Sequence, residues 1–170
     1  MITRRQALQV GGASFALLSI QPTLLAATDV IDITMAGRPD GSHVWFDPIG
    51  VHIQPGQTVR WTNKDAANAH TATAYHPDIL DRPRRIPNGA RPWDSGYLMP
   101  GESFEMRLTV TGVYDYYCQP HEHAGMVGRI VVGRPPDRDY PNTARSGLIA
   151  LPDAALANFP TIADILASSK

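Results

Sequence analysis

The chain has 170 residues, of which 18% are charged and 43% apolar, and its 15 basic side chains nearly balance its 16 acidic ones. This composition excludes a disordered chain and a bundle of membrane helices, and it gives no support for a nucleic-acid-binding surface. The length corresponds to one domain that can bury a core, and a single cysteine cannot form an internal disulfide.

The N-terminal segment has the pattern of an export signal. Arg4 and Arg5 precede a short apolar run over 13–20, and small residues before a possible cleavage site end at Ala27. This pattern is typical of a signal peptide, whereas a membrane span needs about 20 apolar residues. The arginine pair resembles a twin-arginine signal. We therefore predict a signal peptide over residues 1–27, with an uncleaved anchor as the alternative, and a periplasmic or otherwise exported protein.

Residues 28–133 have the pattern of a single β domain. Apolar and polar side chains alternate over 30–35 and again over 58–62, and Pro55-Gly56 marks a turn before the second run. Further strands are predicted over 44–46, 50–53, 70–75, 103–110, 113–117 and 126–132. Seven or eight short strands, with no convincing helix among them, favour a β-sandwich whose loops at one end hold the functional side chains.

Two segments depart from this pattern. Residues 76–99 form a long, Pro-rich, basic loop with four arginines, which are Arg82, Arg84, Arg85 and Arg91. Loops of this length are usually functional or surface excursions, and either a partner-docking surface or a cover over the sandwich would fit. The extension 134–170 carries apolar residues at helical spacing from Leu156 to Leu166. It predicts a helix packed on the domain, with a flexible or separate interaction segment as the alternative.

The only cysteine lies close to other side chains that bind metals. Cys118 is followed by His121, His123 and Met126, and His70 lies on a separate predicted strand. Thiolate, imidazole and thioether together are typical of a type 1 copper centre, because Cu(I) prefers sulfur donors and imidazole serves both oxidation states. The alternatives are a buried free thiol, a zinc site, and ordinary core packing of the methionine. Spacing alone leaves both histidines after the cysteine as candidates.

The sequence around these candidates resembles the plastocyanin/azurin (cupredoxin) family. Residues 112–128 are similar to the C-terminal copper motif of that family, and 46–71 are similar to its N-terminal half, especially in pseudoazurins and halocyanins. The Cys-x2-His-x4-Met interval through His121 is the plastocyanin and pseudoazurin interval, so the resemblance favours His121 over His123. It covers about residues 29–133 and leaves the C-terminal extension unmatched.

The resemblance implies a Greek-key β-sandwich that binds one type 1 copper ion. The implied ligands are His70, Cys118 and His121, with Met126 in the weak axial position. Ala69, Thr71 and Pro120 are the residues expected beside them, with the carbonyl of Ala69 near the copper. Many relatives have asparagine directly after the first histidine, so the hydroxyl of Thr71 is expected to replace only part of its hydrogen-bond network.

The predicted function is one-electron transfer without a substrate reaction. The resemblance implies a monomeric carrier, not an enzyme, whose copper cycles between Cu(I) and Cu(II). Its expected partners are a donor and an acceptor redox protein, with transient contact to a membrane complex and none to nucleic acid. His121 is the expected electron exit, and Tyr117 beside the cysteine is a second route. A copper-binding protein for delivery or storage is the alternative, and it would need an exposed, exchangeable site.

Overall fold

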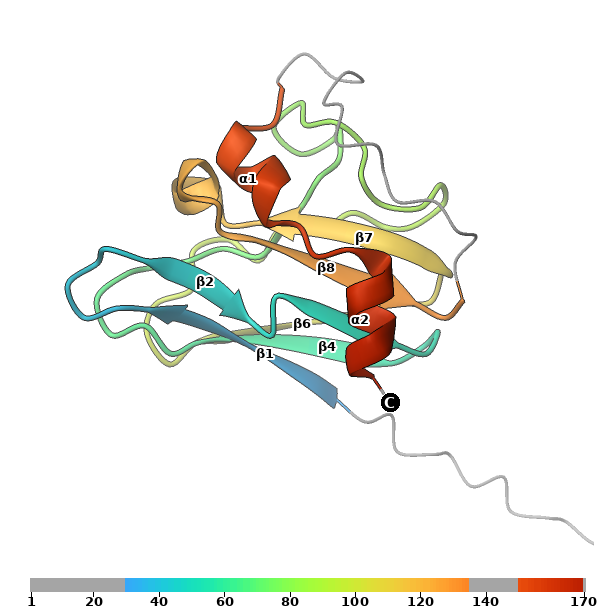
Figure 1. The fold of residues 1–170 in the computed structure, drawn as a ribbon, viewed down its shortest axis with the longest axis horizontal. Helices are drawn as coiled ribbons and strands as arrows, with labels where there is room; N and C mark the ends of the chain where they lie inside the picture. The colour runs from blue at the N-terminus through green and yellow to red at the C-terminus, as the bar shows by residue number, and fades with distance from the viewer. Residues whose placement is uncertain (1–29, 135–149, 170) are drawn as a thin grey trace, which may run out of the picture.

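The computed structural model describes residues 30–134 and 150–169, so the predicted signal peptide lies outside the described residues. Two four-stranded sheets pack face to face, and two short helices follow at the C-terminal end (Figure 1). The eight strands of the described residues confirm the predicted Greek-key β-sandwich. None of the helices in these two described ranges is long and apolar enough to cross a membrane.

The first sheet has the order β2-β1-β4-β6. Its strands are β1 (Val30–Gly37), β2 (Val44–Asp47), β4 (Thr58–Asn63) and β6 (Ser103–Arg107). β1 pairs in parallel with β4 and antiparallel with β2, and β6 closes the other edge. Val59, Trp61 and Asn63 of β4 are buried while their neighbours are half-buried, which is the alternation expected of a strand with one inward face.

The second sheet has the order β3-β8-β7-β5. Its strands are β3 (Gly50–Ile53), β5 (Thr73–Ala74), β7 (Gly112–Tyr117) and β8 (Val127–Val132). Every residue of β7 and β8 is buried, because other segments cover the outer face of this sheet as well as the inner one. The strand predicted over 70–75 is reduced to two residues, since the backbone of 70–72 bonds the loop over 95–98 instead.

The basic loop over 76–99 packs on the sandwich as a cover. Ile86, Trp93 and Leu98 are buried in the main core. Two of its arginines are buried too: Arg82 pairs with Glu122, and Arg85 pairs with Asp115 of β7. Arg84 and Arg91 remain exposed. Half of the positive charge of the loop is therefore turned inward, toward acidic partners that are distant in the sequence.

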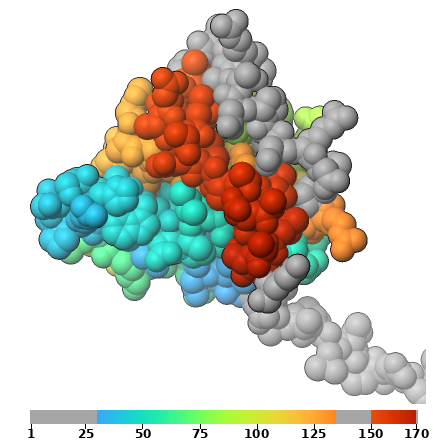
Figure 2. All heavy atoms as spheres, in the orientation of Figure 1, coloured from blue at the N-terminus to red at the C-terminus, as the bar shows by residue number. Residues whose placement is uncertain are grey.

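The predicted C-terminal helical extension is confirmed, but as two helices, α1 (Asp153–Asn158) and α2 (Ile162–Ser168). Pro160 separates the two helices because it has no amide proton to donate to a continuous helix. The Thr161 side chain then caps the N-terminus of α2. Both helices lie on one side of the molecule (Figure 2), where α1 contacts the 3-10 turn η1 (Gln119–Ala124) and α2 contacts β3.

Candidate metal centre

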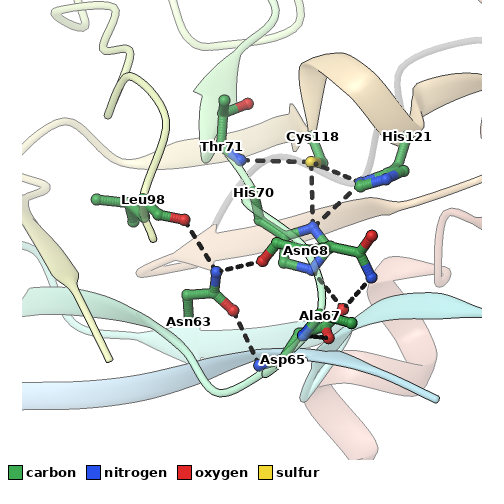
Figure 3. A network of polar contacts seen from close by, with 9 residues as sticks. All are labelled: Asn63, Asp65, Ala67, Asn68, His70, Thr71, Leu98, Cys118 and His121. Atoms are coloured by element: carbon green, nitrogen blue, oxygen red, sulfur yellow. Dashed lines mark hydrogen bonds and ion pairs between the residues drawn. The ribbon is translucent and has the colours of Figure 1, made fainter. Parts of the chain in front are cut away.

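Three potential metal ligands from two separate segments of the chain meet in one cluster (Figure 3). The Sγ atom of Cys118 lies 3.6 Å from Nδ1 of His70 and 3.4 Å from Nδ1 of His121, and the two Nδ1 atoms are 3.1 Å apart. His70 precedes β5, Cys118 directly follows β7, and His121 lies in η1. Ala69, directly before His70, is half-buried. The cluster therefore depends on the complete fold.

The turn that follows Cys118 is fixed by its own backbone. Cys118 precedes η1 in an extended conformation, the exposed Pro120 occupies its first turn, and Gly125 ends it with a φ of 80°. The amide of Met126 donates to the carbonyl of His121 over 3.1 Å, and the Cys118 amide donates to the carbonyl of Met126 over 3.0 Å. Met126 is itself buried in the main core. The short Cys-to-Met interval is thus closed into one hydrogen-bonded turn.

The two histidines of this turn lie in different surroundings. His121 is half-buried and belongs to the cluster, whereas His123 is exposed and lies outside it. Burial and the neighbouring His70 lower the pKa of His121, so its imidazole is neutral at pH 7 and has a lone pair for a metal. Burial raises the pKa of the Cys118 thiol to about 11, although the Thr71 amide opposes this. A metal that binds there must displace the thiol proton.

His70 has a second polar partner that the sequence did not reveal. Its Nε2 atom lies 3.0 Å from Oδ2 of Asp65, and both side chains are buried (Figure 3). Asp65 also accepts hydrogen bonds from the Asn68 side chain and the Ala67 amide, while its own amide donates to Asn63. Burial alone would raise the pKa of the Asp65 carboxyl, but these hydrogen bonds, led by the one from Asn68, lower that pKa to about 2.

Thr71 ties the two ligand-bearing segments together. Its amide donates to Sγ of Cys118 over 3.3 Å, and its hydroxyl accepts from the amide of Gln119 over 2.9 Å. The same hydroxyl bonds that of Thr73, which in turn donates to Asp94. The Gln119 side chain bonds both Thr73 and Asp94. The sequence pointed to Thr71 alone, because the other three residues are joined only through the fold.

The aromatic neighbour of the cysteine does not reach the surface. Tyr117 is 2% exposed and stacks on Tyr75, with the two ring centroids 4.3 Å apart. The Arg82 guanidinium lies 5.1 Å from the Tyr117 ring centroid, and Ala155 of α1 belongs to the same buried cluster. Glu122 accepts a hydrogen bond from the Tyr75 hydroxyl and pairs with Arg82. Tyr117 is therefore covered by the basic loop and α1, and the second route expected through it stays a prediction.

Comparison with known proteins agrees with this geometry. Residues 33–133 match the family of copper binding proteins described as the plastocyanin/azurin family. The chloroplastic plastocyanin of Chlamydomonas reinhardtii is 33% identical over 120 residues, which cover 71% of this chain and 80% of that protein. A pseudoazurin of Methylorubrum extorquens is 28% identical over 122 residues, which cover 71% and 74%. The structure of a Sinorhizobium pseudoazurin superposes with a TM-score of 0.56 at 27% identity, covering 83% of this chain and 96% of that one.

The residues of the cluster also fit copper chemically. One thiol and two imidazoles converge, and a methionine follows in the same turn, so sulfur and nitrogen donors are both available. Members of the matched family are electron carriers that bind one copper ion. The family match spans more than half of the sequence, and it agrees with the fold and with the residue types at the site. The chain therefore belongs to the plastocyanin/azurin family of copper-binding proteins, and copper is its cofactor.

Proposed function

We propose that this protein is an exported, single-domain type 1 copper protein that carries one electron at a time between two redox proteins. Its proposed strong ligands are His70, Cys118 and His121, with Met126 as the axial ligand. The observation that carries the proposal is the convergence of Sγ and two Nδ1 atoms within 3.1 to 3.6 Å of one another. When bound, copper supplies the one-electron couple Cu(II)/Cu(I).

The role of the protein is then to hold its ligands still. The imidazole of His70 and the thiol of Cys118 are fully buried, and each is hydrogen-bonded to a neighbouring loop. The Thr71 hydroxyl and the closed turn before Met126 restrict the movement of these ligands. Ligands that do not rearrange when the charge of the site changes favour fast electron transfer, and this supports a carrier without a substrate reaction of its own.

The surface next to the site supports docking of another protein. Tyr97 and Met99 are 63% and 55% exposed, and they flank Leu98, whose backbone pairs with that of His70. Exposed apolar side chains beside a site are typical of interaction surfaces. We propose that redox partners approach this end of the protein, where His121 is half-exposed. The signal-like residues 1–27 and the relatives named as chloroplastic support export.

Copper loading tests this function against delivery or storage. Purified mature protein is titrated with copper(II), and we expect one copper per chain and an intense visible band that ascorbate bleaches and a mild oxidant restores. The buried His70 and Cys118 predict slow copper loss to a chelator. A protein without this band contradicts the carrier function. Loss of copper to a modest chelator within the mixing time would instead favour delivery.

The axial role of Met126 predicts a change in redox potential. Met126→Leu should retain copper and raise the reduction potential, because loss of the thioether destabilises Cu(II) more than Cu(I) and the axial ligand tunes the potential of such sites. We expect roughly a tenfold shift in the relative affinity for the two oxidation states, about 59 mV for a one-electron couple. Redox titration of the loaded variant measures it.

Met106→Leu is the matched control, because Met106 lies on β6 opposite Val59, at the far end of β4 from Asn63. Its potential should equal that of the wild type. An unchanged potential in Met126→Leu would remove this residue from the axial position.

A further inference from the structure

The two ring nitrogens of His70 face different partners. Nδ1 lies toward the sulfur of Cys118, at 3.6 Å, while Nε2 lies 3.0 Å from Oδ2 of Asp65 (Figure 3). The exposed fractions of the His70 and Asp65 side chains are 0% and 2%, so the contact is shielded from bulk solvent. A carboxylate only accepts hydrogen bonds, and Nε2 therefore carries the proton. Nδ1 is left with the lone pair that a metal needs.

The Asp65 carboxylate is itself held in place. The Ala67 amide donates to Oδ1 over 2.9 Å, and the Asn68 side chain donates to Oδ2 over 2.7 Å. Asn63 accepts from the Asp65 amide and donates to the carbonyls of Asn68 and Leu98, which anchors this turn to the neighbouring loop. Among residues 30–134 and 150–169, Asp65 has one basic partner in an ion pair, which is the imidazole of His70.

A glycine in the first sheet leaves space for this carboxylate. A Cβ atom at Gly37, the last residue of β1, would lie 2.0 Å from Oδ2 of Asp65. Its φ lies outside the left-handed region, so glycine is required here for space and not for backbone freedom. The oxygen that would be displaced is the one that contacts His70. Gly37 of β1, which is distant in the sequence, thus leaves the space in which the Asp65 carboxylate contacts His70.

We infer that Asp65 is a positioning residue for the copper site, which holds His70 as the Nε2–H tautomer and lowers the reduction potential through its buried negative charge. A carboxylate bonded to the outer nitrogen makes an imidazole a more basic ligand. A fixed negative charge in a medium of low dielectric constant also favours the more positive Cu(II) state. The effect on potential depends on the proposed function, whereas the tautomer of His70 does not.

Redox titration of copper-loaded Asp65→Asn tests the effect on potential. Asparagine has nearly the same shape without the charge, and we expect the potential to rise by roughly the tenfold effect that outer partners of metal ligands commonly have, about 59 mV for one electron. The matched control is Glu105→Gln, which removes one acidic charge at an exposed position of β6. Gly37→Ala should raise the potential in the same direction but by less, because it displaces the oxygen that contacts His70 while the carboxylate keeps its charge.

Nitrogen-15 NMR of the copper-free wild type tests the tautomer independently of the variants. The His70 signals are identified by their loss in His70→Gln, and at a pH where the imidazole is neutral the proton should reside on Nε2. A proton on Nδ1 overturns the inference. It is also overturned if the wild type shows the visible copper band but Asp65→Asn shifts the potential no more than Glu105→Gln. A wild type without that band rejects the proposed function, and the NMR result then decides the tautomer alone.

Discussion

Cys118→Ser is expected to abolish the intense visible absorption of the copper-loaded protein. The band arises from charge transfer between thiolate sulfur and copper, and a serine hydroxyl is neither soft nor ionised near neutral pH. No second cysteine can replace the lost thiolate, since Cys118 is the only one in the chain. Essentially all of the band should disappear. Visible spectra at equal protein concentration, together with the copper content of each sample, measure the effect.

His123→Ala is the control for this experiment. His123 is exposed and lies outside the cluster that contains His121, so its removal should leave the band nearly intact. A band that survives in Cys118→Ser would contradict thiolate ligation. A band that collapses in His123→Ala would exchange the roles assigned to the two histidines.

Asp115→Asn is expected to destabilise the fold severely. The Asp115 carboxylate is fully buried between Arg85 and Arg129, with contacts of 2.8 Å to one Nε and 2.7 Å to the other. Removing one partner of a buried ionic group leaves a charge that is poorly compensated, which typically costs about 3–5 kcal/mol. The free energy of unfolding of the copper-free protein, obtained by urea denaturation, should fall by about this amount.

The same cluster joins several segments, which explains why its loss should affect the whole domain. Arg85 comes from the basic loop, Asp115 from β7 and Arg129 from β8, and Arg129 also donates to the carbonyl of Pro160 between the two helices. Glu105→Gln serves as the control, because the pair of Glu105 with Arg60 is exposed to solvent. Exposed pairs contribute little to stability, so little change is expected there. An equally small change in Asp115→Asn would contradict the structural importance of the cluster.

The features that were predictable from the sequence are local. Neighbouring residues are enough to recognise the alternation in β4, the Gly and Pro turns, and the Cys-x2-His-x4-Met interval. The contact between Asp65 and His70 was not predictable, because it depends on a turn and on the space left by Gly37 in another strand. From the sequence, Arg82 would likewise be predicted to lie on the surface, because its ion pair with Glu122 forms only in the folded protein.

The C-terminal extension gives a further example. Its apolar spacing predicted a helix, and Pro160 accounts for the division into two. The contact of α1 with the ligand turn, where Asn158 donates to the carbonyl of Gly125, has no signal in the sequence. A Cβ atom at Gly125 would lie 2.4 Å from the Asn158 side chain, so the close approach of these segments is a property of the folded protein.

The burial of Tyr117 has a consequence for the kinetics of the proposed carrier. Because Tyr117 is covered by the basic loop and α1, a carrier of the kind proposed would use the half-exposed edge of His121 for both the donor and the acceptor. Two proteins that need the same edge compete for it and cannot bind at once. Each turnover then requires one partner to dissociate before the other associates. An excess of either partner should therefore inhibit the overall flow of electrons, as an excess of one substrate inhibits a ping-pong reaction.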